Sequence, residues 1–169
     1  MENGLPALMI AAILMLSSVL ISRGGLLGAD AIGQTLRESE ARYGQQNRTG
    51  LTVTGTAIDA SGANITVTVR NDGSTPVGDW AAMDVLVQYF GETGTRYDKW
   101  LTFTQVLASD TWTTGAFTSD VFEPGILNQG ESVDLLLRVN PVVAAGTTNR
   151  AIIGTDRGVT VSAYFAGPP

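Results

Sequence analysis

An uncharged, strongly apolar run near the N-terminus constrains this chain more than any other feature. Residues 5–21 read LPALMIAAILMLSSVLI, seventeen residues without a charge, inside an uncharged segment from Asn3 to Ser22. As a helix rising about 1.5 Å per residue, the uncharged segment would be roughly 30 Å long, which matches the hydrocarbon core of a bilayer. The sequence therefore predicts an N-terminal helix that can sit in a membrane.

The charges beside this run bear on how it is delivered. Only Glu2 precedes the run and Arg23 follows it, whereas a secretory signal peptide carries positive charge ahead of its apolar core. Two interpretations remain: an uncleaved signal anchor, or a mature chain from which a basic leader was removed. We favour the removed leader, because Arg23 alone would place an extracytoplasmic domain on the cytoplasmic side. A signal-peptidase site at Ala29-x-Ala31 is a weaker interpretation, because it lies far from Ile21.

Small residues and glycines subdivide the predicted helix. Ala11, Ala12 and Ser17 are among the small residues that allow close helix packing against copies of the chain, although a single anchor is equally compatible. Gly24 and Gly25 predict a bend, and an amphipathic continuation runs to about Gly44. The residues predicted to make helix–helix contacts in a polymer are Leu5, Leu8, Met9, Ile13, Leu14, Leu16, Leu20, Ile21, Leu27, Ile32 and Leu36.

From Thr49 onward, apolar residues alternate with polar ones, and clusters of Gly, Asn and Asp separate short β-branched runs. About seven such runs without an intervening helix are typical of an immunoglobulin-like sandwich. We therefore expect an α+β chain: a long N-terminal hydrophobic helix over residues 1–47, then an immunoglobulin-like antiparallel β-sandwich over residues 48–169. The predicted strands are Leu51–Ile58, Ile65–Val69, Asp84–Phe90, Tyr97–Val106, Ser132–Val139, Ala151–Thr155 and Val159–Phe165.

A long loop and three tryptophans complete the predicted sandwich. The segment Ala108–Gly130 shows no clear alternation and is expected to be a loop over one end of the sheet. Trp80, Trp100 and Trp112 could together form a platform for stacking sugars. Trp100 lies in an alternating run and is expected in the core, whereas the other two remain open.

The composition argues against enzymatic and nucleic-acid functions. The chain has no Cys and no His, which removes thiolate and imidazole catalysis and the usual zinc, copper and haem ligands, so no metal or cofactor is expected. The net charge of -6 lies entirely after Gly50, and an acidic domain repels nucleic-acid phosphates. Asp79 with Asp84, and Asp120 with Glu123, are candidate carboxylate pairs of the glycosidase kind, but exposed loop acids are the better explanation. We predict no enzyme.

Two tripeptides match the N-glycosylation pattern. They begin at Asn47 and Asn64, and each has a threonine two residues later. Their use depends on an extracytoplasmic location for the domain.

The full layout resembles the archaellins, the type IV pilin-like filament subunits of the archaeal swimming organelle. The resemblance rests on the apolar N-terminus PALMIAAILMLSSVLI, the extension RGGLLGADAIGQTLRESEARYG, and a Thr-rich β domain with a VRNDGST turn. It implies a helical filament of many copies, with N-terminal helices in the core and sandwich domains on the extracellular surface. It also implies insertion in the membrane before assembly, a prepilin-type peptidase and a basal motor. The glutamate that pilins carry at the fifth mature position is replaced by Leu5, which favours archaellin over pilin.

Two alternatives belong to other functional classes. The layout of the chain also resembles the stator proteins of the archaellum, in which an N-terminal helix is followed by a small sandwich that binds the cell envelope. A pilin-like adhesin is the third hypothesis. Stoichiometry separates the first two, because a filament subunit is abundant in sheared filaments whereas a stator stays in the membrane fraction at low copy number.

Overall fold

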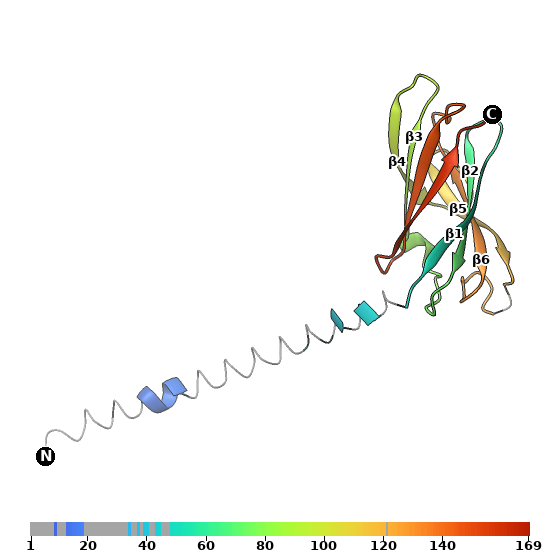
Figure 1. Cartoon of the computed structure of the whole chain (residues 1–169). Helices are drawn as coiled ribbons and strands as arrows, with labels where there is room; N and C mark the ends of the chain where they lie inside the picture. Colours follow the sequence, from blue (N-terminus) through green and yellow to red (C-terminus); the bar gives the residue numbers. More distant parts are fainter. Residues whose placement is uncertain are drawn as a thin grey trace, which may run out of the picture. The chain divides into compact units, whose positions relative to one another are not determined.

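The computed structural model describes residues 48–120 and 122–169, together with residues 9, 13–18, 34, 37, 39, 40, 43 and 44 (Figure 1). The chain divides into two compact units, Met1–Tyr43 and Gly44–Pro169. Each unit is described by itself below.

The described residues of the first unit correct the prediction of a long N-terminal helix. The described residues there are helical, and residues 13–18 form one short helix; no long helix is present among the residues that the structure describes. Met9, Ile13, Leu14 and Leu16 are between 61% and 65% exposed, so most of their side-chain surface is not buried by tertiary packing, which supplies most helix stability in proteins. Within the described part of the chain, no helix has the length and apolar character needed to cross a bilayer.

Several N-terminal predictions fall on residues outside those described. They are the contact residues Leu5, Leu8, Leu20, Ile21, Leu27, Ile32 and Leu36, the bend at Gly24 and Gly25, the Ala29-x-Ala31 site and the sequon residue Asn47.

The second unit is built almost entirely from β-strands, with one short 3-10 helix, η1 (Trp80–Ala82). Eight strands form a single sheet in the order β1-β2-β6-β5-β4-β3-β7-β8. The strands are β1 (Leu51–Ile58), β2 (Asn64–Asn71), β3 (Asp84–Phe90), β4 (Arg96–Phe103), β5 (Thr111–Thr118), β6 (Ser132–Arg138), β7 (Thr148–Gly154) and β8 (Thr160–Ala166). The predicted bounds of β1 and β3 are confirmed, and the other predicted strands differ at their ends.

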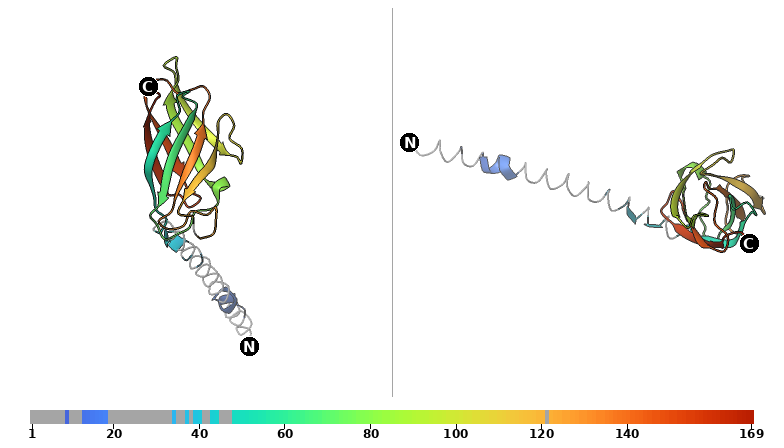
Figure 2. Two further views of the ribbon diagram at one scale, coloured as in Figure 1. Left: turned by 90° about the vertical axis from the view of Figure 1, so that its right-hand side faces the viewer. Right: turned by 90° about the horizontal axis from the view of Figure 1, so that it is seen from above.

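The sheet curls so that its two ends approach each other, and the strands are arranged in a ring when the domain is seen from above (Figure 2). One half contains β1, β2, β6 and β5, and the other contains β4, β3, β7 and β8. A short parallel pairing joins the halves, with Thr102 opposite Thr111 and Phe103 opposite Trp112. At the other seam, the Thr56 hydroxyl donates to the Tyr164 carbonyl at 3.2 Å. The predicted antiparallel sandwich is therefore wrong: the domain is one nearly closed sheet, in which β4 and β5 form a parallel pair.

The core fills the space inside this ring because alternate residues of each strand point inward. Ile65, Val67 and Val69 of β2 are fully buried, as are Val133, Leu135 and Leu137 of β6. Burying each such side chain is worth about 1.5–3 kcal/mol relative to leaving it in water.

The tryptophans and the predicted loop differ from expectation. Trp112 is 0% exposed and packs edge-on against Phe103, with the ring centroids 4.9 Å apart. Trp112 belongs to β5, which lies inside the predicted loop Ala108–Gly130, so the loop assignment is wrong for this segment. A bulge between Thr114 and Phe117 breaks the alternation of β5 and conceals it in the sequence. Trp100, predicted in the core, is 66% exposed because its neighbour Leu101 takes the inward position.

Candidate functional site

The outer surface of β4, β3, β7 and β8 carries large side chains that the core does not use. We call it the aromatic face, and it is made of Leu86, Phe90, Trp100, Ile152 and Tyr164. Strand pairing brings them together: Leu86 lies opposite both Trp100 and Ile152, and Arg150 lies opposite Tyr164. Trp100 and Tyr164 are 66% and 64% exposed. Neighbouring apolar side chains that stay exposed on a protein surface are typical of binding surfaces.

One depression on the aromatic face has an apolar floor. It has a volume of about 210 Å³ and is lined by Asp84, Leu86, Trp100, Ile152, Gly154 and Thr160. Leu86, Trp100 and Ile152 supply the apolar surface, whereas the Asp84 carboxylate and the Thr160 hydroxyl lie at one end. This depression can take a flat ligand with one apolar side.

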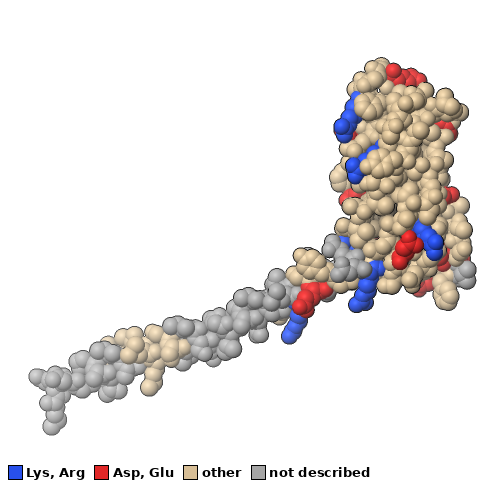
Figure 3. Space-filling model, viewed as in Figure 1, with Lys and Arg blue, Asp and Glu red and all other residues tan. Residues whose placement is uncertain are grey.

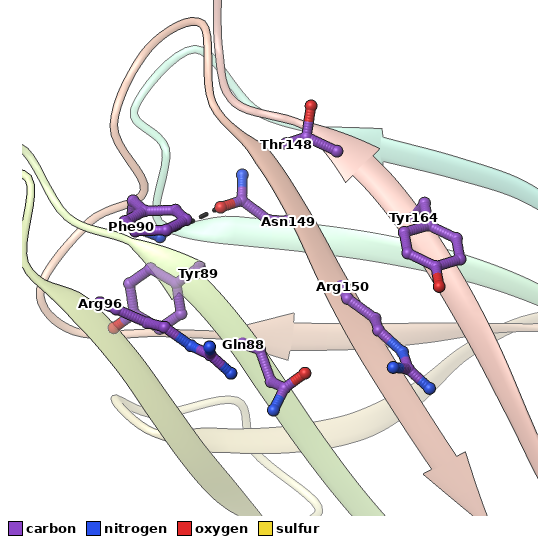
Figure 4. Close-up of a pocket in the computed structure, with 8 residues that line it drawn as sticks. All are labelled: Gln88, Tyr89, Phe90, Arg96, Thr148, Asn149, Arg150 and Tyr164. Atoms are coloured by element: carbon purple, nitrogen blue, oxygen red, sulfur yellow. Dashed lines mark hydrogen bonds between the residues drawn. The ribbon is translucent and has the colours of Figure 1, made fainter.

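A second depression of about 210 Å³ lies farther along the same strands and is basic (Figure 4). In Figure 4 the Gln88 side chain lies between the guanidinium groups of Arg96 and Arg150. The residues that line this basic depression are Gln88, Tyr89, Phe90, Arg96, Thr148, Asn149, Arg150 and Tyr164. Strand register explains the gathering, because Gln88 pairs with Arg150, and Phe90 pairs with Arg96.

Neutral groups hold the Arg150 side chain in place. Its Nε and one Nη donate to the Ser162 hydroxyl at 3.2 and 2.8 Å, and its guanidinium carbon lies 5.7 Å from the centre of the Tyr164 ring. Among the described residues, no carboxylate forms an ion pair with Arg150. Arg96 makes one exposed ion pair with Asp98 at 3.2 Å. Both guanidinium groups keep donors for a ligand.

The floor of the basic depression is rigid. Asn149 is buried, and its side-chain oxygen accepts a hydrogen bond from the Phe90 backbone N–H at 3.1 Å. The Tyr89 hydroxyl donates to the Pro141 carbonyl at 2.8 Å, and the Tyr89 ring stacks on Tyr97 at 5.4 Å. Burial, together with the charge of Asp110 and the neighbouring Tyr97, raises the pKa of Tyr89 to about 12. Tyr89 therefore stays neutral and fixed at physiological pH.

Charged side chains are sparse on this side of the domain. In Figure 3, seen from the side on which β7 and β8 lie in front, uncharged side chains cover most of the surface. Acidic residues outnumber basic residues in the domain. Two arginines beside one depression therefore make a locally basic site on an acidic domain.

The other predicted site residues do not converge. Trp80 packs edge-on against Phe117 at 5.9 Å and donates to the Gly125 carbonyl, and Trp112 is buried, so Trp100 alone is available for stacking. Asp79 precedes η1, whereas Asp84 begins β3 beside the apolar depression. The Asp120 carboxylate accepts from the Gly125 N–H at 3.3 Å, within the turn that also contains Glu123. Across the described positions, no three His, Cys, Asp or Glu side chains group as metal ligands do.

The candidate glycosylation residue Asn64 is partly occupied by a local contact. Its side-chain nitrogen, the atom to which a glycan would attach, donates to the Asp59 carboxylate at 2.6 Å. Attachment of a glycan there would compete with this bond.

The sequence analysis did not predict that Arg96 and Arg150 line the same depression. The two residues lie in separate strands, and nothing in the spacing of either arginine indicates that β7 lies beside β3. An outward position within an alternating strand was the only available signal, and many exposed residues share it.

Comparison with solved structures relates the fold to archaellum proteins. The archaellum periplasmic stator protein FlaG from Sulfolobus acidocaldarius is 18% identical over 69% of this chain and 99% of the FlaG chain, with a TM-score of 0.52. The FlaF–FlaG stator complex from the same organism gives 17% identity over 68% of this chain and 87% of that chain, with a TM-score of 0.51. The archaeal flagellum of Methanospirillum hungatei strain JF1 gives 15% identity over 97% of this chain and 93% of that chain, with a TM-score of 0.58.

No protein-family model and no curated protein matches the sequence. At these identities the structural likeness establishes a shared fold. The fold is common to stator and filament structures of the archaellum, so it does not single out the archaellin family predicted from the sequence.

Proposed function

We propose that this chain is a non-enzymatic archaellum component with a stator-like role, in which the β domain lies outside the cytoplasm and binds a fixed part of the cell envelope. The observation that carries the proposal is the structural match of 69% of this chain to 99% of the FlaG chain. Further support comes from the surface of the β domain.

The aromatic face supports a binding role. Trp100 and the half-buried Leu86 stand on the interior strands β4 and β3, and Tyr164 stands on the end strand β8 of the nearly closed sheet, so the sheet holds them in a fixed arrangement. A stator has to transmit force from a moving machine to a fixed structure. A preorganised rigid surface loses little conformational entropy on binding and suits this task.

The chemistry of the domain also fits a role without catalysis. The carboxylates of Asp79 and Asp84 are exposed, and the described residues contain no cluster of metal ligands. In this proposal the apolar run Leu5–Ile21 provides attachment to lipid or to apolar surfaces of other archaellum proteins.

Deletion of the gene tests the stator-like role directly. In a host that swims with archaella, a strain lacking this chain should still assemble filaments visible by negative-stain microscopy, but its cells should not swim. The protein should be recovered at low copy number in membrane fractions. Normal swimming of the deletion strain would contradict the proposal.

A filament subunit is the second candidate, favoured by the match that spans 97% of this chain and 93% of the archaeal flagellum chain. In that case the same deletion removes the filaments, and sheared filaments consist largely of this chain. The variant Leu14→Arg, which places a charge in the apolar run, should then abolish assembly. Val106→Arg, at an exposed position of the β domain, is the matched control and should leave filaments unchanged.

A further inference from the structure

The two depressions on the aromatic face lie next to each other, and together they form one elongated amphipathic surface. Gln88 and Arg150 pair across β3 and β7, and two residues along each strand Leu86 and Ile152 form the next pair. Two residues of a strand span about 6.6 Å. A ligand of two or three rings can therefore reach from the arginines to Trp100.

The basic end has the chemistry of a carboxylate site. Arg150 is oriented by Ser162 and Tyr164, two neutral groups, and lacks an ion-pair partner among the described residues. Guanidinium groups bind carboxylates through paired, charge-assisted hydrogen bonds. The Gln88 amide between the two arginines adds a neutral donor (Figure 4). An anionic group placed there meets the guanidinium of Arg150 and that of Arg96, whose exposed ion pair with Asp98, opposite Gln88 on β4, would have to open or be shared.

The apolar end has the chemistry of a sugar platform. Trp100 is 66% exposed, and Leu86 and Ile152 extend its apolar surface. Sugar rings have an apolar C–H side that packs on an aromatic ring, as other amphipathic ligands do. The Asp84 carboxylate and the Thr160 hydroxyl at the far end can accept hydrogen bonds from sugar hydroxyls.

We propose that the aromatic face binds an acidic polysaccharide, with Arg150 and Arg96 holding the carboxylate of one sugar unit and Trp100 stacking on a neighbouring unit. This inference does not depend on the proposed stator-like role.

The strand order argues against an acidic peptide as the ligand. β3 and β7 are interior strands, each paired on both sides, so their backbone cannot accept a peptide as an added strand. A peptide would depend on side-chain contacts alone, and the flat exposed ring of Trp100 offers it no deep pocket. Acidic peptide is therefore the competing ligand in the test.

The test measures binding of trigalacturonic acid to the full chain in a neutral detergent, by calorimetry and by tryptophan fluorescence. The comparison ligands are neutral maltotriose and triglutamate. We expect trigalacturonic acid to bind at least about tenfold more tightly than either, because only it offers both carboxylates and sugar rings. Equal binding of triglutamate, or no detectable binding of trigalacturonic acid at millimolar concentration, would overturn the proposal.

Variants assign the two ends of the surface. Arg150→Gln and Arg96→Gln should each weaken binding of trigalacturonic acid about tenfold or more, and Trp100→Ala should weaken it about fivefold. Arg138→Gln and Phe122→Ala are the matched controls, since both residues are exposed and lie outside the aromatic face. Arg96 is exposed, so Arg96→Gln keeps the test valid if Arg150→Gln does not fold. An equal loss in Arg138→Gln would mean non-specific charge attraction and would overturn the site.

Discussion

The two halves of the sheet enclose one core but present different outer faces. The half with β1, β2, β6 and β5 has an outer surface that we call the threonine face, made of Thr52, Thr54, Thr66, Thr68, Asp134 and Leu136. Its polar groups bond within the face: the Thr68 hydroxyl donates to the Asp134 carboxylate at 2.7 Å. On the aromatic face, by contrast, the Trp100 and Tyr164 rings are mainly exposed. Both halves alternate in the same way, so alternation alone does not distinguish a solvated face from a binding face; the types of side chain at the outward positions do.

The largest expected effect tests the shared core beneath both faces. Leu135→Ala should lower the free energy of unfolding by about 2–5 kcal/mol, because Leu135 is fully buried. Its neighbour Leu136 points to the threonine face and packs over Gly115, so Leu136→Ala should cost about 1 kcal/mol. Urea unfolding monitored by circular dichroism measures both. Equal losses would mean that the assignment of inward and outward positions on β6 is wrong.

Tyr89→Phe tests the support under the aromatic face. The variant loses the hydrogen bond to the Pro141 carbonyl at 2.8 Å and should be less stable by about 1 kcal/mol. Because the pKa of Tyr89 is raised to about 12, the unfolded chain releases this proton first. The stability due to Tyr89 is therefore present at neutral pH and is lost as the pH rises from about 10 to 12. Ultraviolet titration should show one tyrosine near pH 12 in the wild type, missing in the variant.

Asp59→Asn tests the turn between β1 and β2, next to the threonine face. Burial raises the pKa of Asp59, but hydrogen bonds from Ser61, Ala63 and Asn64 outweigh it and hold the pKa below its ordinary value. The carboxylate thus adds stability above its unfolded pKa, and this stability is lost as the pH falls through the lower folded pKa. We expect the variant to lose about 0.5 kcal/mol at pH 7. The difference should vanish in strong acid, and a constant difference across the acid range would contradict the assignment.

Trp100→Ala should have the smallest effect on folding, because the side chain belongs to the aromatic face and not to the core. An exposed side chain that contributes little to the core should change the free energy of unfolding by less than about 0.5 kcal/mol. Thermal unfolding measures this change. A loss of several kcal/mol would mean that Trp100 is structural, which would remove the main reason for treating the aromatic face as a binding surface.

Local patterns were sufficient to predict several elements of the β domain. The alternation in LTVTGTAI and DVLVQYF placed β1 and β3 within their observed bounds. The cluster NDGST was predicted to leave the strand as a turn, and in the structure the Asn71 side chain donates to the Thr75 carbonyl across it at 2.9 Å. These features depend on a few consecutive residues, so the sequence carries them directly.

Other features depend on partners that are remote in sequence. β5 was missed because its bulge between Thr114 and Phe117 breaks the alternation, and only pairing with β6 makes the strand recognisable. Trp100 and Leu101 are adjacent, and closure of the sheet decided which of them faces the core. The prediction of a long N-terminal helix was wrong for the described part of the first unit, where residues 13–18 form a short helix. An apolar pattern indicates a helical preference, but packing supplies most of a helix's stability.

The strand-rich character after Thr49, the acidic charge of the domain and the lack of Cys and His can all be read from the amino-acid sequence. The single nearly closed sheet, the exposure of Trp100 and the shared depression of Arg96 and Arg150 become visible with the three-dimensional fold. Alternation shows that every second residue of a strand faces the same side, but it shows neither which side faces the core nor which strands are neighbours. Both are set by the core that the whole sheet encloses.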